Sequence, residues 1–157
     1  MPLFRTRFRR WCVGAGLVVV AVPLVWFGAL PHFRSLQAES TRNSATNLAT
    51  SLGLRLTDAE SIDYAEFHGG FPDSTAYLVV DSESANRASQ LRSESNLTSC
   101  RPPRAIDLDA GPAGHRPQPS PTLQYCEAPF DGHGHLSVLW DPAADEGRRI
   151  HVRALEA

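Results

Sequence analysis

Residues 11–30, WCVGAGLVVVAVPLVWFGAL, form an apolar stretch of twenty residues without a charged side chain. A helix of that length, with a rise of about 1.5 Å per residue, spans about 30 Å, the thickness of a bilayer's hydrocarbon core. Trp11 and Trp26 lie near its two ends, where aromatic side chains favour the membrane interface. The sequence therefore predicts a transmembrane helix over residues 11–30, with the lipid bilayer as its surroundings.

The ten residues before this stretch form a basic tail that contains Arg5, Arg7, Arg9 and Arg10 and no acidic residue. Because positively charged flanks stay in the cytoplasm, residues 1–10 are predicted to be cytoplasmic and the C-terminal domain extracytoplasmic. A cleaved signal peptide, followed by secretion, is the alternative. Signal cores usually have about 7–15 apolar residues and end at a small-x-small site, so the length and flanks favour an uncleaved signal-anchor. The predicted location is the cell membrane, with a single pass.

The chain after the apolar stretch is acidic. Residues 31–157 contain eleven arginines, no lysine and all seventeen acidic residues, which gives a net charge of −6. A surface of that sign repels nucleic acid and anionic lipid, so nucleic acid is not an expected partner. The exclusive use of arginine as the basic residue is typical of a GC-rich genome.

Cys100 and Cys126 are the only cysteines after the apolar stretch. A pair of cysteines in an oxidising compartment predicts a disulfide. Between them lie residues 101–121, with six prolines and two glycines and without periodicity, so a mobile proline-rich loop is predicted there. The disulfide would then tie the two ends of this loop together.

Hydrophobic periodicity divides the chain beyond residue 30 into a juxtamembrane helix and connector, residues 31–60, and a domain, residues 61–157. The juxtamembrane helix is predicted over residues 41–52. In the domain, alternating apolar residues and turn signals predict five strands and one helix that begins at Asp81 or Ser82. The predicted strands are 61–67, 75–80, 122–127, 136–140 and 150–154, and the helix ends near residue 94.

These elements predict an α+β fold class. A single N-terminal transmembrane helix is followed by a small extracytoplasmic domain, with a mainly antiparallel sheet and one or two covering helices. Two runs, LGLRLTDAESIDYAEFHGGFPDSTAYLVV and WDPAADEGRRIHV, resemble small, functionally uncharacterised membrane-anchored or secreted proteins of actinobacteria. The resemblance implies a location and a fold class, and it carries over no catalytic residue.

The run Asp131-Gly-His133-Gly-His135 is the most suggestive local cluster for metal binding. Two histidines at i and i+2 of an extended strand point the same way, and with Asp131 or His115 they would supply ligands for Zn²⁺ or Cu²⁺. The glycines equally suit a flexible turn that enters a strand, and this simpler interpretation stays open beside the metal site. No other cofactor is expected.

No catalytic motif is found in the sequence, which contains no Gly-x-Ser-x-Gly elbow, phosphate-binding glycine loop or His-Glu-x-x-His pair. Asp107-Leu-Asp109 lacks the remaining ligand positions of a calcium loop, so a solvated loop is expected there. The expected function is a non-enzymatic binding or accessory component of the bacterial cell envelope, whose partner is an envelope protein or ligand. A small extracytoplasmic metal-binding protein or enzyme that uses His133 and His135 is the alternative.

Overall fold

The computed structural model describes residues 35–70, 73–109, 111–129, 132, 134–144 and 147–156. The chain divides into two compact units, Met1–Glu39 and Ser40–Ala157. In the first unit only residues 35–39 are described, and they are helical. The predicted basic tail and transmembrane helix lie outside the described residues, and so do their flanking residues Arg5, Arg7, Arg9, Arg10, Trp11 and Trp26. Within the described part of the chain, no helix has the length and hydropathy needed to span a bilayer.

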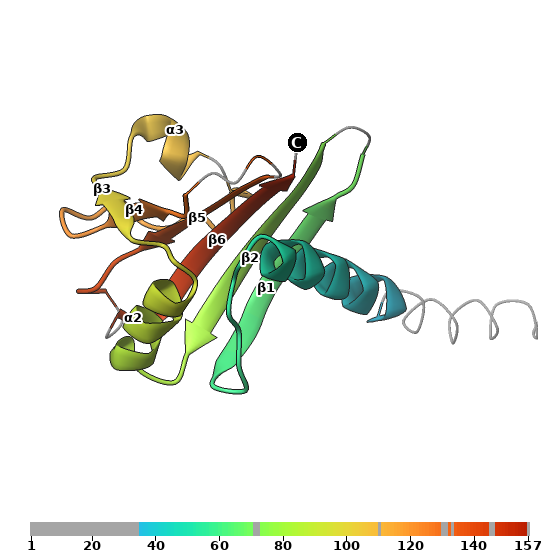
Figure 1. The fold of residues 1–157 in the computed structure, drawn as a ribbon, viewed down its shortest axis with the longest axis horizontal. Helices are drawn as coiled ribbons and strands as arrows, with labels where there is room; N and C mark the ends of the chain where they lie inside the picture. Colours follow the sequence, from blue (N-terminus) through green and yellow to red (C-terminus); the bar gives the residue numbers. More distant parts are fainter. Residues whose placement is uncertain are drawn as a thin grey trace, which may run out of the picture. The chain divides into compact units, whose positions relative to one another are not determined.

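The second unit is built on one six-stranded sheet (Figure 1). Its strands follow the order β1-β2-β6-β5-β4-β3, and every neighbouring pair is antiparallel. The strand bounds are β1 Glu60–His68, β2 Ser74–Ser82, β3 Ser99–Arg101, β4 Gln124–Glu127, β5 Gly134–Trp140 and β6 Arg149–Glu156. With the helical residues 40–51 and helix α2, Ala85–Glu94, the sheet confirms the predicted α+β fold and its antiparallel sheet.

One face of the sheet carries the hydrophobic core and is called here the core face. In register across three strands, Leu78 of β2 lies opposite Val152 of β6, which lies opposite Val138 of β5. All three are at most 2% exposed. The helical segment 40–51 and α2 cover this face with small and aliphatic side chains, namely Ala45, Leu48, Ala49, Ala88 and Leu91. The predicted helix over residues 41–52 therefore packs on the domain, because its apolar stripe completes this core.

Helix α2 begins later than the sequence predicted. Ser84 is its N-cap, and the Ser84 side chain accepts a hydrogen bond from the backbone N–H of Arg87. Asp81 and Ser82, the predicted caps, belong instead to β2, because Ser82 pairs with Glu60 at the end of the β1–β2 ladder. An ion pair of 2.6 Å between Arg87 Nε and Glu60 Oε1 then connects α2 with β1.

The proline-rich segment contains regular structure that the sequence analysis did not predict. Arg101 is the last residue of β3, and the short helix α3 spans Ala105–Leu108. Asp107 in α3 is 7% exposed, so the expectation of a solvated loop is wrong at this carboxylate. Arg101 donates two hydrogen bonds to it, of 2.6 and 3.2 Å, and these bonds hold the pKa of Asp107 down to about 2. A buried ion pair thus connects α3 to the edge of the sheet.

Candidate functional site

The opposite face of the sheet is rich in polar and aromatic side chains, and a covering segment, residues 111–120, lies over part of it. On three neighbouring strands this face carries Tyr64 of β1, Tyr77 of β2 and His151 of β6. The His115 imidazole stacks on the Tyr64 ring, with 3.7 Å between the ring centroids. Strand residues and the covering segment therefore meet in one cluster of ionisable side chains.

Gly111 allows the covering segment to approach Tyr77 closely. A Cβ atom placed at residue 111 would lie 2.5 Å from Tyr77 Cζ and 2.6 Å from Tyr77 Oη, both shorter than van der Waals contact. The Tyr77 side chain is buried, and its hydroxyl is held by two hydrogen bonds. Glycine is therefore needed here for steric reasons, independently of its backbone conformation.

Tyr77 Oη is the hydrogen-bonding centre of this cluster. It donates to the backbone carbonyl oxygen of His115 at 2.9 Å and lies 2.9 Å from His151 Nδ1. Because the phenol has only one proton, His151 Nδ1 is the donor in the second bond. The neutral His151 ring then has no proton on Nε2, which is left as a hydrogen-bond acceptor.

Burial shifts the titration of both side chains away from neutral pH. The pKa of Tyr77 is raised, chiefly because its phenol is removed from water. The pKa of His151 is lowered to about 4, first by burial and then by the positive charge of Arg149. Neither group changes its charge between pH 6 and 8, so the pair serves as a fixed hydrogen-bonding element.

A cavity of about 640 Å³ opens beside His151, between the covering segment and the end of the sheet. His115, Arg116, Arg149 and His151 lie in its lining, and Asp141 is the acidic residue there. Two guanidinium groups are therefore placed at one cavity of a domain whose overall charge is negative. A cavity of this size and lining fits a small ligand with a carboxylate or phosphate group.

Both guanidinium groups at this cavity are held in place by other groups. Arg116 Nε donates to the carbonyl oxygen of Gly111 at 2.7 Å, and Arg116 Nη1 donates to Asp109 at 3.0 Å. Arg149 donates two hydrogen bonds of 2.7 Å to the Asp81 carboxylate. Arg149 also donates to Asp63 at 3.2 Å. A guanidinium has five N–H donors, and the bonds described for Arg116 use two of them. Such fixed donors lose little freedom on binding.

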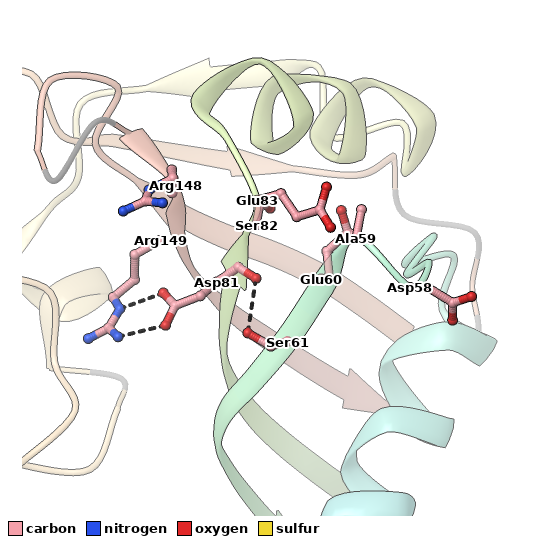
Figure 2. Close-up of a pocket in the computed structure, with 9 residues that line it drawn as sticks. All are labelled: Asp58, Ala59, Glu60, Ser61, Asp81, Ser82, Glu83, Arg148 and Arg149. Carbon is pink, nitrogen blue, oxygen red and sulfur yellow. Dashed lines mark hydrogen bonds and ion pairs between the residues drawn. The ribbon is translucent and has the colours of Figure 1, made fainter.

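A second cavity, of about 810 Å³, lies at the end of β1 and β2 (Figure 2). Its charged lining consists of four acidic residues and two arginines, namely Asp58, Glu60, Asp81, Glu83, Arg148 and Arg149. Two of the acidic residues already have arginine partners, because Glu60 pairs with Arg87 and Asp81 pairs with Arg149. Among the described residues no group of histidine, cysteine or acidic side chains is arranged to hold a metal ion. Arg149 lines both cavities, and the His151 cavity is taken as the candidate ligand site because its arginines lie beside His115 and His151 rather than among four carboxylates.

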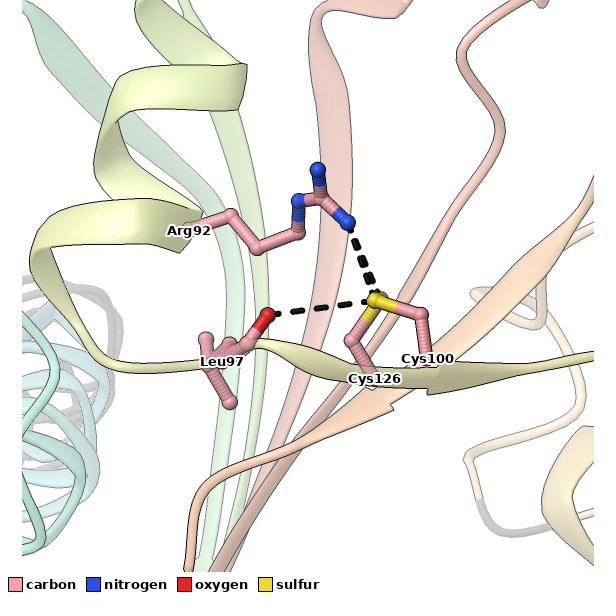
Figure 3. The surroundings of a disulfide bond; sticks show 4 residues. All are labelled: Arg92, Leu97, Cys100 and Cys126. Atoms are coloured by element: carbon pink, nitrogen blue, oxygen red, sulfur yellow. Dashed lines mark hydrogen bonds between the residues drawn. A yellow bond between two sulfur atoms is a disulfide. The ribbon is translucent and has the colours of Figure 1, made fainter.

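The predicted disulfide is confirmed. Cys100 of β3 and Cys126 of β4 are direct register partners and are bonded, with a Cα–Cα distance of 4.1 Å (Figure 3). The bond therefore joins two adjacent strands and also closes the proline-rich segment between them, as predicted. The mobility predicted for residues 101–121 stays a prediction.

The residues predicted as metal ligands are only partly described. Asp131 and His133 lie outside the described residues. His135 is in β5, where its Nε2 lies 3.0 Å from Tyr125 Oη and 3.7 Å from Glu127 Oε2. His115, the other predicted ligand, stacks on Tyr64. The metal site at residues 131–135 stays a prediction.

The His151 cavity was not predicted from the sequence. His151 lies in the alternating run of the last predicted strand, and Tyr77 is inside a run, TAYLVV, that is apolar on both faces. The signal for Tyr77 was the phenol itself, because a buried tyrosine hydroxyl usually has a partner. Its partner is 74 residues away in the chain and is brought near by the β2–β6 pairing.

Comparisons with known proteins do not assign a relative. No family model matches the chain, and no match was found to a curated protein or to a solved structure. Function is therefore inferred below from the chemistry of the domain itself.

Mild acid should destabilise the domain through His151. Its folded pKa of about 4 lies below the ordinary value of 6.5, so the unfolded chain binds the proton more tightly. This contribution to stability is complete above pH 6.5 and is lost as the pH falls from 6.5 towards 4. After a discount for partial solvent screening, we expect a loss of about 1 kcal/mol between pH 7 and pH 5, which cover about half of the full effect. Urea unfolding at pH 7 and pH 5 measures this loss.

The control for this prediction is His151→Gln, which keeps a polar side chain but does not titrate. Its stability should change much less between pH 7 and pH 5 than that of the wild type. Asp81 and Glu60 also have lowered pKa values, but they start near 4 and act mainly at lower pH. If the free energy of unfolding fell equally between pH 7 and pH 5 in the wild type and in the variant, the assignment to His151 would be wrong.

Proposed function

We propose that this chain is a single-pass membrane protein of the cell envelope whose extracytoplasmic domain is a binding module. The ligand is an anionic envelope component, with a carboxylate or phosphate group that binds in the His151 cavity. The observation that carries the proposal is the placement of Arg116 and Arg149, held by carboxylates, at one cavity of an acidic domain. The apolar stretch 11–30 and the disulfide support the membrane location and the outward orientation.

The titration behaviour of the cavity favours binding over proton-transfer catalysis. A general base works best when its pKa is close to the working pH. The pKa of His151 is about 4 and that of Tyr77 is raised, so neither exchanges a proton readily near neutrality. Their fixed hydrogen bonds instead suit a ligand-binding surface of constant charge and shape.

Cross-linking in native membranes, followed by purification of the full chain, tests the proposal. Arg116 is exposed, so Arg116→Ser removes one cavity charge with little effect on the core. We expect the amount of co-purified envelope component to fall about tenfold or more, since a charged hydrogen bond contributes about 1.5–3 kcal/mol. The matched control is Arg42→Ser, which makes the same change on an exposed helical position away from the cavity.

Recovery of equal amounts by both variants would contradict the assignment of this cavity as the binding site. Recovery of free protein alone from wild-type membranes would contradict the binding function itself. The intact mass of the membrane-extracted protein separates an uncleaved anchor from a secreted product, because removal of the N-terminal segment lowers the mass by thousands of daltons.

A small metal-binding protein is the second candidate function. The observation in its favour is Glu127, whose carboxylate lies 3.7 Å from Nε2 of His135, one of the predicted ligands. Zn²⁺ or Cu²⁺ would be the metal of that donor set. Unchanged metal content after replacement of His133 and His135 by alanine would exclude this function.

A further inference from the structure

The surroundings of the disulfide suggest an activity separate from ligand binding. Cys126 is completely buried in the core, whereas Cys100 is exposed on the edge strand β3. An edge strand has no sheet neighbour on its outer side, so a reagent in solvent approaches Cys100 before Cys126. The two sulfur atoms therefore differ in accessibility.

Arg92 of α2 lies directly at the disulfide (Figure 3). Its Nη1 is 2.9 Å from Cys100 Sγ and 3.3 Å from Cys126 Sγ. The guanidinium carbon lies 4.4 Å from the centroid of the Trp140 ring, a cation–π contact that fixes the group in position. A positive charge is thus held against a pair of neutral sulfur atoms.

This arrangement gives Arg92 few electrostatic partners in the oxidised protein. Among the described ion pairs none involves Arg92, and its buried Nε has no hydrogen-bond partner among the described atoms. Burial lowers its pKa, which shows that the charged form is less well solvated there. Reduction of the disulfide would place a thiolate beside the guanidinium and so supply the missing negative charge.

We propose that Cys100–Cys126 is a redox-active disulfide that exchanges with external dithiols, and that Arg92 stabilises the thiolate formed during exchange. A thiolate of the dithiol attacks Cys100 Sγ, the Cys100–Cys126 bond breaks, and its electron pair stays on Cys126 Sγ beside Arg92. The second thiolate of the dithiol then attacks its own sulfur in the mixed disulfide, and Cys100 leaves as a thiolate. The dithiol is oxidised by two electrons to a disulfide, the cysteine pair is reduced by two, and the thiol protons exchange with water.

Dithiothreitol is the probe that tests this proposal on the full chain in detergent. The rate of reduction is followed by quenching with an alkylating reagent and measuring the mass. We expect Arg92→Gln to slow the reduction about tenfold and to lower the reduced fraction at a fixed ratio of reduced to oxidised probe. Arg104→Gln, a change at an exposed arginine of the same domain, should leave both values unchanged.

A second measurement needs only the wild type and does not depend on how Arg92→Gln folds. The rate of cysteine alkylation is measured against pH in the reduced protein, and the pH of half-maximal rate reports the pKa of the thiol. For the faster cysteine, this pH should lie about one unit lower in the folded protein than in the urea-unfolded chain. Equal pH values of half-maximal rate would overturn the proposal, and so would equal reduction rates in wild type and folded Arg92→Gln. These outcomes are independent of the His151 cavity, because Arg92, Cys100 and Cys126 do not line it.

Discussion

Replacing both Cys100 and Cys126 by serine should lower the free energy of unfolding by at least about 3.5 kcal/mol. The bond closes a loop with a sequence separation of 26 residues, and removing it returns the corresponding entropy to the unfolded chain. Since small domains have total stabilities of about 5–15 kcal/mol, this is a large share. Urea unfolding of the full chain, with the wild type in its oxidised form, measures the difference.

The buried position of Cys126 provides a control for this prediction. Cys126→Ser places a hydroxyl in the core, so part of a loss in the double variant comes from that polar atom. The pair Cys100→Ala and Cys126→Ala leaves no polar side chain and isolates the effect of the cross-link. A loss below about 1 kcal/mol in the alanine pair would contradict a stabilising role for the disulfide.

Replacing Leu78 by alanine should lower the free energy of unfolding by about 2–5 kcal/mol. Leu78 is fully buried in the middle of β2, between β1 and β6, and its side chain faces the helical cover. Alanine removes the transfer energy of three carbon atoms and leaves a cavity that a rigid sheet cannot close. The midpoint of urea unfolding should fall while the slope stays constant.

Leu155 in β6 offers a matched comparison, because it is a leucine of the same sheet that points to the opposite face. It is only half-buried, so Leu155→Ala should cost clearly less than Leu78→Ala. Equal losses for the two variants would mean that the core does not lie on the face assigned here.

The parts of the fold that depend on local pattern were predictable from the sequence. In β5, Leu136, Val138 and Trp140 alternate with Ser137 and Leu139, and in β6 apolar residues alternate with polar ones over residues 150–154. The structure pairs these two strands in register. The helix near residues 41–52 was also visible, because Ala45, Leu48 and Ala49 follow helical spacing and form its buried stripe. Each of these signals lies within about ten consecutive residues.

The parts that depend on distant residues were not predictable. Strand β3 has only three residues, and it exists because Cys100 pairs with Cys126 and Arg101 pairs with Tyr125 across the proline-rich segment. The burial of Asp107 depends likewise on Arg101, whose side chain no local pattern places there. Short strands and buried ion pairs are stabilised by tertiary contacts, and local helix or strand propensity does not predict them.

The candidate site was the least predictable feature, because it is assembled from four separate segments. Tyr77, His115, Arg116, Arg149 and His151 come from β2, the covering segment and β6, and Asp141 comes from the turn after β5. These residues do not form a recognisable sequence motif. Only the sheet order β2-β6-β5 and the path of residues 111–120 bring these groups together, with Tyr77 behind the cavity as the hydrogen-bond partner of His151.

Site-specific photo-cross-linking in intact cells tests the central claim most directly. A photoreactive amino acid replaces Gln118, an exposed residue in the lining of the His151 cavity, or Asn47, an exposed residue of the helical segment. If the cavity binds an envelope component, the residue 118 probe forms a discrete cross-linked product and the residue 47 probe forms little or none. The same products in equal amounts from both positions, or none from residue 118, would contradict the account.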